Sequence, residues 1–151
     1  MANQKPSGYP YSQFNYTVLV GTDPGTGPNA AFQEVSGLGR EVHMAEYRGG
    51  NAQFNSPVKV PGSSKFSDVT CKRGLIGNLD LSNWMDNLVN GTDDARPVVI
   101  NLLSEDRQTV AQTWTLTNAR LMKYTGPSLT GKGTDVAIEE FVLSVERIDI
   151  K

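Results

Sequence analysis

Reactive side chains are scarce in this sequence of 151 residues, which contains one cysteine, Cys71, and one histidine, His43. A lone cysteine excludes an intramolecular disulfide, and these two side chains cannot form the ligand set of a structural zinc site. A single histidine also removes most histidine-based catalysis and metal chemistry. The other residues offer no paired carboxylates at a plausible site and no Ser/His/Asp arrangement. We therefore expect no catalytic residue, no metal site and no cofactor.

An excess of one charge and long hydrophobic runs are also absent. The chain has 14 Lys and Arg residues against 16 Asp and Glu residues, a formal net charge of −2, whereas nucleic-acid-binding domains usually carry a basic surplus. No stretch approaches the roughly 18 consecutive apolar residues of a membrane span, and the first 13 residues lack the apolar core of a signal peptide. We expect a protein that is made in the cytoplasm and does not insert into membranes, with a flexible segment over residues 1–13 and one domain over residues 14–151.

Short apolar segments separated by glycine and proline predict a mainly β domain. In the first of these segments Phe14, Tyr16, Val18 and Val20 alternate with other residues, which is typical of a strand. A long polar turn follows at residues 21–29. Further strands are predicted over residues 31–35, 40–47, 66–73, 98–103 and 110–118.

One amphipathic helix is predicted over residues 79–89, with Asp80 in its first turn and Gly91 at its end. Its apolar stripe consists of Leu81, Trp84, Met85 and Leu88. The last segment, residues 136–150, fits both a helical and an alternating pattern. Because β-branched residues are frequent there, we favour one long strand with both faces partly covered.

Alternation also assigns the faces of two predicted strands. Over residues 66–73, Val69 and Cys71 lie inward, so Cys71 is a core residue rather than a nucleophile. Over residues 110–118, Trp114 and Leu116 share one face, while the other face is small, neutral and wettable. That second face comprises Ala111, Thr113, Thr115 and Thr117. A threonine row is usually an ordinary solvent face, and a more specific role is equally open to it.

Residues 48–64 show neither helical nor strand periodicity and contain three glycines and two prolines. We expect an irregular excursion from the body of the domain. Structureless loops longer than about 12–15 residues are uncommon in compact domains and usually serve a function. The segment is therefore a candidate binding surface, and the alternative is a long surface loop without a role.

A glycine-rich segment at residues 126–133 matches the phosphate-binding loop GxxxxGK[ST] except at its last position. Gly133 stands where that motif has the hydroxyl that binds magnesium. The motif also requires a following helix whose N-terminus faces the phosphate, and the next segment favours a strand. We expect a β connection without nucleotide affinity.

The order of the segments from Phe14 onward carries further information. The series runs FNYTVLV, FQEVSGLGREVHMAEYRGG, VPGSSKFSDVTCKRGLIGNLDLSNWMDNL, WTLTNARLMKYTGPSL and VAIEEFVLSVERIDI. Its most distinctive parts are VSGL at residues 35–38 with EYRGG at 46–50, and KRGL at 72–75 leading into the tryptophan-containing helix. In order and spacing, the series resembles the tail-tube proteins of contractile phages and of phage-tail-like contractile injection systems.

The resemblance implies a β-sandwich or small barrel with one flanking helix, whose subunits join into a hexameric ring-shaped β-barrel. Such rings stack into the inner tube of the particle, a virion or a released extracellular particle assembled in the bacterial cytoplasm. The implied partners are further copies of the chain, a sheath protein, baseplate or hub proteins, a tube terminator, and an effector protein or DNA as cargo in the lumen. The alternatives are a paralogous tube initiator near the baseplate, a monomeric ligand-binding β-sandwich, and an enzyme that uses the glycine-rich segment.

The resemblance also suggests working surfaces. In the family the long loop after the second strand reaches a neighbouring ring, which corresponds here to residues 48–64. The expected stacking residues are Arg48, Gly49, Gly50, Asn51, Phe54 and Val58, with Phe54 and Val58 as apolar anchors. The row of Thr113, Thr115 and Thr117 is the candidate lumen lining, because any charge on a lumen wall would be repeated by every subunit.

Overall fold

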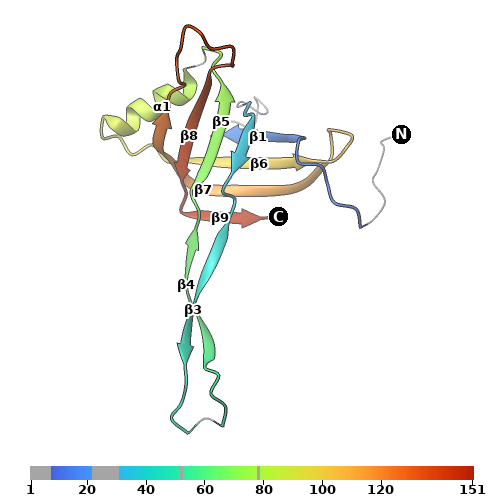
Figure 1. Cartoon of the computed structure of the whole chain (residues 1–151), viewed down its shortest axis with the longest axis vertical. Coiled ribbons are helices and arrows are strands. Elements are labelled where there is room, and N and C mark those ends of the chain that lie inside the picture. Colours follow the sequence, from blue (N-terminus) through green and yellow to red (C-terminus); the bar gives the residue numbers. More distant parts are fainter. Residues whose placement is uncertain (1–7, 22–30, 52, 78) are drawn as a thin grey trace.

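The computed structural model describes residues 8–21, 31–51, 53–77 and 79–151, and these residues form a mainly β structure with one helix (Figure 1). The elements are β1 (Tyr16–Val20), β2 (Glu34–Ser36), β3 (Arg40–Tyr47), β4 (Val58–Phe66), β5 (Val69–Gly74), α1 (Asp80–Val89), β6 (Arg96–Leu103), β7 (Val110–Thr125), β8 (Ile138–Ser144) and β9 (Arg147–Ile150). Apart from Gly21, the turn expected at residues 21–29 lies outside the described residues. No helix among the described residues is long and apolar enough to cross a membrane.

The body consists of two strand layers that share β7. The first layer, sheet A, has the antiparallel order β1-β6-β7-β9. The second layer, sheet B, has the antiparallel order β7-β8-β5-β2. In Figure 1 the strands of sheet A run across the view, whereas β5 and β8 follow the long axis of the molecule. The mainly β sandwich expected from the sequence is confirmed.

Strand β7 forms the corner between the two layers. It has 16 residues and continues well beyond the strand expected over residues 110–118. Its first half pairs with β6 and β9, and its second half pairs with β8. Asn118 adopts a positive φ of 51°, where a short polar side chain is tolerated better than most. The chain turns from one layer to the other at this point.

The C-terminal segment corrects one expectation. A single long strand over residues 136–150 is wrong, because β8 ends at Ser144 and β9 begins at Arg147. The two strands pair with different halves of β7 and so belong to different layers. The break lets Phe141 and Leu143 face the core from sheet B and Ile148 face it from sheet A. Alternation predicted the strand character but not this change of layer.

The core lies between the two sheets and α1. Its largest fully buried side chains are Trp84, Phe141, Leu116, Ile148, Val18, Val69 and Val98, together with Cys71. Helix α1 contributes Leu81 and Trp84, with Met85 and Leu88 packed at the margin, as its stripe predicts. The indole Nε1 of Trp84 donates to the carbonyl oxygen of Asp94 at 2.7 Å, so the one polar atom of this ring is paired.

The end of α1 follows a Schellman motif. The amide of Thr92 donates to the carbonyl oxygen of Asn87 at 2.9 Å, and the amide of Gly91 donates to that of Leu88 at 3.2 Å. Gly91 has a φ of 90°, a conformation that glycine adopts without steric cost. The expectation that Gly91 ends the helix is confirmed, with Asn90 as the capping residue before it.

A buried ion pair interrupts the apolar interior of sheet B. Arg73 and Glu139 are opposite each other on β5 and β8 and are each 3% exposed. The Arg73 Nε donates to Glu139 Oε1 at 2.5 Å, and the hydroxyl of Tyr124 donates to Glu139 Oε2 at 3.1 Å. The Arg73 guanidinium also lies 5.2 Å from the centre of the Phe141 ring. Sequence reasoning missed this pair, although both alternating rows, Val69-Cys71-Arg73 and Glu139-Phe141-Leu143, extend into it.

The most consequential correction concerns residues 48–64, which are not an irregular excursion. Residues 58–66 form β4, which pairs with β3 from Arg40↔Phe66 to Tyr47↔Val58. The pairing stops at the tip (residues 48–57), and within the pairing His43, Gly62 and Ser63 fall at a register shift. Phe66, expected at the start of the next strand, is the last residue of β4. The two strands and the tip form one hairpin, the arm (residues 40–66), which extends away from the body along the long axis (Figure 1).

Candidate functional site

Metal-ligating side chains and the single cysteine are the first places to look for a reactive site. No group of three or more His, Cys, Asp and Glu side chains among them could hold a metal ion. Cys71 is buried, and burial raises the pKa of its thiol to about 12, so the reactive thiolate is not available near neutral pH. The sequence-based assignment of Cys71 to the core is confirmed. The candidate functional features are therefore surfaces.

The glycine-rich segment at residues 126–133 connects two antiparallel strands, β7 and β8. No helix follows it, so it lacks the aligned helix N-terminus that a phosphate-binding loop uses. The expectation of a β connection is confirmed. The residue just before β8 lies beside the start of the β5–α1 connection, because the amide of Leu75 donates to the carbonyl oxygen of Ala137 at 2.9 Å.

The arm is solvent-exposed over almost its whole length. Every residue of β3 is exposed, and so is every residue of β4 except Phe66. Directly paired residues share a face of a hairpin, so Ala45↔Val60 and Tyr47↔Val58 place four uncharged side chains together. We call this set, Ala45, Tyr47, Val58 and Val60, the apolar arm face. The opposite face carries the charged pair Glu46↔Lys59 and, nearer the body, the apolar pair Met44↔Pro61.

The tip of the arm is closed by an arginine. The Arg48 Nε donates to the carbonyl oxygen of Phe54 at 3.2 Å, and its Nη2 donates to Asn55 Oδ1 at 3.3 Å. The Phe54 side chain is 75% exposed. The structure thus places Arg48 and Phe54 together at the tip, with Gly49, Gly50 and Asn51 between them in sequence. Val58, expected in the same loop, is instead the first residue of β4.

Sheet A has an outer face that turns away from the core. Register pairs Asn101 with Thr113, and Thr115 with both Val99 and Asp149, so these side chains share one face. Thr113, Thr115 and Thr117 are all partly exposed there, opposite the buried Leu116. The Thr113 hydroxyl donates to Asn101 Oδ1 at 2.8 Å. The predicted two-faced character of this strand is confirmed, and its threonine row belongs to a larger, mostly neutral surface.

The two edges of sheet A are open. Among the described residues, β1 pairs only with β6, and β9 pairs only with β7. Because each pairing in the order β1-β6-β7-β9 is antiparallel, β1 and β9 run in opposite directions. Open edges are templates for pairing with another chain. The base of the arm lies beside β9, where Val42, Ser64 and Phe66 line a depression together with Ile148 and Asp149.

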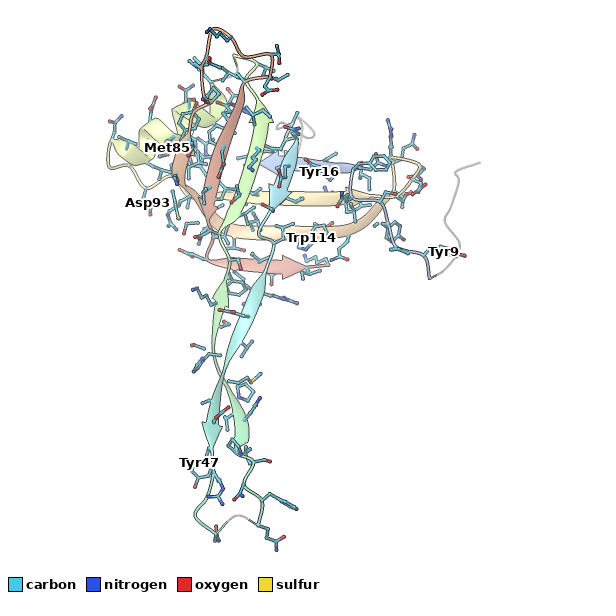
Figure 2. The ribbon with its side chains drawn as sticks, in the orientation of Figure 1. Tyr9, Tyr16, Tyr47, Met85, Asp93 and Trp114 are labelled. Carbon is cyan, nitrogen blue, oxygen red and sulfur yellow. The ribbon has the colours of Figure 1, made fainter. Side chains whose placement is uncertain are left out.

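An apolar groove opens on the core-facing side of sheet A, at the end that sheet B does not cover. The sheet A groove has a cavity volume of about 230 Å³. It is lined by Tyr11, Gln13, Tyr16, Val35, Leu38, Ile100, Leu102 and Trp114. Figure 2 shows Tyr16 and Trp114 on the body and Tyr47 far along the arm. Of the segment expected to be flexible, residues 8–13 are described, and Tyr11 and Gln13 take part in this groove.

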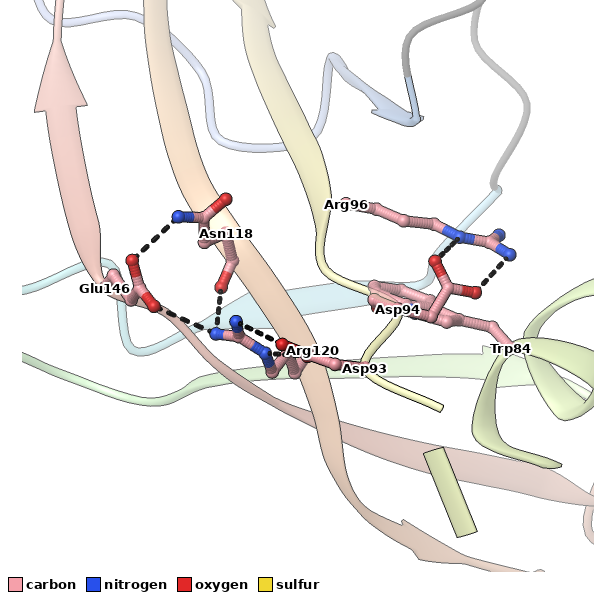
Figure 3. A network of polar contacts seen from close by, with 7 residues as sticks. All are labelled: Trp84, Asp93, Asp94, Arg96, Asn118, Arg120 and Glu146. Carbon is pink, nitrogen blue, oxygen red and sulfur yellow. Dashed lines mark hydrogen bonds and ion pairs between the residues drawn. The ribbon is translucent and has the colours of Figure 1, made fainter. Parts of the chain in front are cut away.

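A polar network braces the corner next to α1 (Figure 3). The Arg120 Nε donates to Asp93 Oδ1 at 2.6 Å, and its Nη1 donates to Glu146 Oε1 at 3.0 Å. Hydrogen bonds from Arg120 lower the pKa of Asp93, and those from Asn118 and Arg120 lower the pKa of Glu146. Arg120 therefore ties the loop after α1 to the break between β8 and β9. We assign the network a structural role, because its charges are paired with one another.

Two open sheet edges, a mostly neutral outer face and a long exposed arm are the features of a chain built for assembly. Residues 12–149 match the family model of the T4-like virus tail tube protein gp19. The chain belongs to this tail tube family. No protein of curated function matches it by sequence.

Solved structures agree with the tail tube assignment. One is the sheath-tube complex of an extracellular contractile injection system, PVC, in the extended state, with a TM-score of 0.83 and 25% identity over 96% of this chain and 93% of that chain. The sheath/tube terminator of the same system has a TM-score of 0.83 and 26% identity over 97% of this chain and 99% of that chain. The tube-terminating cap of the anti-feeding prophage shares the fold, with a TM-score of 0.83 and 23% identity over 99% of this chain and 96% of that chain. The chain is a structural inner-tube subunit.

Proposed function

We propose that copies of this chain join edge to edge into hexameric rings and that the rings stack into the hollow inner tube of a phage tail or contractile injection system. The observation that carries the proposal is the pair of open edges on sheet A. If β9 of one subunit pairs with β1 of the next, the antiparallel order continues around the ring. Closure then removes every edge of sheet A, which is the usual way in which β proteins prevent uncontrolled pairing.

In this arrangement the outer face of sheet A lines the lumen. The proposed lining includes Thr113, Thr115 and Thr117, with Asn101 and Val99 beside them. Arg147 and Asp149 place one positive and one negative charge on the same face. The Arg147 Nε donates to Asp149 Oδ1 at 2.8 Å, so the two charges offset each other. Lys151 also belongs to this face, because it exchanges both backbone hydrogen bonds with Thr113, and it adds a positive charge. The rest of the proposed wall is neutral or internally paired, so we expect it to hold an effector protein or DNA only weakly and the lumen to serve as a passive conduit.

The tip of the arm is the proposed contact between rings. Phe54 supplies an exposed apolar anchor, and Arg48 holds the tip in shape through its two hydrogen bonds. Glycines at positions 49 and 50 allow a close approach of backbones. By analogy with the PVC and anti-feeding prophage structures, we expect a sheath around the tube, a terminator at one end and a baseplate at the other. We expect no enzymatic activity.

The test is direct imaging of the purified chain. We expect rings or tubes by negative-stain microscopy and a corresponding early elution from a sizing column. Long tubes would identify a main tube subunit, and single rings that do not stack would identify an initiator near the baseplate. A monomer at every concentration would contradict the proposal and favour a monomeric ligand-binding sandwich.

A further inference from the structure

The apolar arm face is largely uncovered in an isolated subunit. Tyr47 is 68% exposed, Val58 64% and Val60 48%. A two-stranded hairpin is marginally stable in water unless a further strand or surface covers its apolar side. The arm extends away from its own body (Figure 1), so the body of the same subunit supplies no such surface. The covering surface must come from another molecule.

The sheet A groove is a surface of matching chemistry. Tyr16, Leu102 and Trp114 of sheet A form one side of it, and Val35 and Leu38 form the other. The hydroxyl of Tyr16 already donates to the carbonyl oxygen of Phe32 at 2.5 Å. Tyr16 therefore presents ring carbon atoms to the groove. The lining is otherwise apolar except at Tyr11 and Gln13, so a partner needs mainly apolar groups.

The arm and the groove also lie in the same layer. Strand β3 continues from β2, and β4 leads into β5, so the arm extends the layer of sheet B. Val35 and Leu38, beside the groove, belong to that layer or border it. An arm placed over a second subunit would thus fill the part of the layer that sheet B leaves open above sheet A.

The two edges of sheet A bring these surfaces together. The base of the arm lies beside β9, and the arm extends past that edge (Figure 1). Tyr16, in the groove, is the first residue of β1, the opposite edge. When β9 of one subunit pairs with β1 of the next, the arm of the first crosses onto the groove side of the second.

We propose that the apolar arm face of each subunit seats in the sheet A groove of its neighbour in the same ring. This inference rests on the proposed ring and adds its second interface, a side-chain contact behind the shared sheet. The contact is heterologous, since one arm and one groove per subunit are different surfaces, and such contacts close into rings when the rotation allows. It divides the arm into two parts, a shaft that joins neighbours within a ring and a tip that is left for the next ring.

The test is cross-linking in the full chain. We combine Val60→Cys on the apolar arm face with Leu38→Cys at the groove, in a Cys71→Ala background, and treat assembled rings with a short bismaleimide. The expected result is a ladder of covalently linked subunits on a denaturing gel. Lys59→Cys with Leu38→Cys is the matched control, because residue 59 lies on the opposite arm face, and we expect its ladder to be lost.

The other outcomes separate the two proposals. Rings without a Val60–Leu38 ladder, an equal ladder in the Lys59 control, or a link within one subunit would overturn the seating and leave the ring intact. Absence of rings in the wild-type chain would overturn both.

A second measurement needs no substitution. Trp84 is fully buried, so a difference in acrylamide quenching between monomer and ring fractions reports Trp114 in the groove. We expect quenching to fall in the rings, and equal quenching in both fractions would contradict the seating.

Discussion

At the scale of single residues, we expect the free energy of unfolding to be most sensitive to substitution in the buried pair Arg73–Glu139. Removing one partner of a buried ion pair leaves an uncompensated charge in the interior, which typically costs about 3–5 kcal/mol. We expect Glu139→Ala to lower the free energy of unfolding by about that amount, measured by chemical denaturation. Tyr124→Phe should cost less, because it removes one hydrogen bond to a carboxylate whose main partner remains.

The matched control for Glu139 is its neighbour on β8. Glu140 points to the other face, is only partly buried and lies opposite Lys72. Lys72 forms its ion pair with Glu34, at 3.8 Å, so Glu140→Ala should change stability by roughly 0–1 kcal/mol, the range of exposed charged groups. Equal costs at both positions would show that the buried pair carries no special weight.

Lys132 tests the glycine-rich segment. The segment joins two strands and lacks both the magnesium-binding hydroxyl and the following helix, so we expect no change in Tm with ATP and magnesium at millimolar concentration. A thermal-shift assay measures this. An increase of several degrees that disappears in Lys132→Ala would reopen the enzymatic alternative.

At the scale of elements, the Arg120 network makes stability depend on pH in a definite direction. The pKa values of Asp93 and Glu146 are lowered in the fold from ordinary values of 3.8 and 4.5. The folded chain thus binds fewer protons than the unfolded chain around those values. The stabilisation that the Arg120 network gives to the fold is present above about pH 4.5 and is lost as pH falls through the lowered pKa values of Asp93 and Glu146.

We therefore expect Tm to fall on acidification below pH 4.5, and to fall less steeply in Arg120→Gln, which has already lost the network. Scanning calorimetry at several pH values measures this. Lys123→Gln is the control, since it removes an exposed positive charge from the same strand. An identical acid slope in wild type and Arg120→Gln would contradict the assignment of the network.

The arm tip gives the prediction for stacking. Phe54→Asp places a charge where an apolar anchor is expected to enter the contact between rings. Stacking would then bury an unpaired carboxylate, which is strongly unfavourable. We expect rings to form and tubes to be lost in negative-stain images, with the fold unchanged because Phe54 is 75% exposed. Gln53→Asp adds the same charge at the adjacent exposed position and should shorten tubes far less. Tubes of normal length in Phe54→Asp would disprove the role of the tip.

The elements also show what the sequence could and could not predict. Strands with one face in the core, such as 69–73 and 98–103, and helix 79–89 have the periodicity that burial imposes. Strand β4 has none, because both of its faces are exposed and Pro61 and Gly62 interrupt the alternation at a register shift. The arm was therefore missed as a hairpin, although its role as a projecting surface was expected. The arm packs against no core of its own subunit, so burial imposes no periodicity on its sequence.

At the scale of the whole molecule, the proposed lumen lining predicts different thiol reactivity on the inner and outer sides of the assembled tube. In a Cys71→Ala background, Thr115→Cys and Thr117→Cys should react with a small thiol reagent and be protected from one too large to enter the bore. Val89→Cys, on the exposed side of α1, should react with both. Labelling of tubes with each reagent, followed by mass spectrometry, measures this. Rapid reaction of residues 115 and 117 with the large reagent would place the threonine row outside the lumen.

The double membership of β7 has a mechanical consequence. One continuous backbone of 16 residues runs from sheet A into sheet B. A load applied to sheet A therefore reaches sheet B through covalent bonds as well as through packed side chains. Shearing the two layers apart would require the corner at Asn118, braced by Arg120, to unravel first. In the proposed tube, this course of β7 would stiffen each subunit against a load along the tube axis.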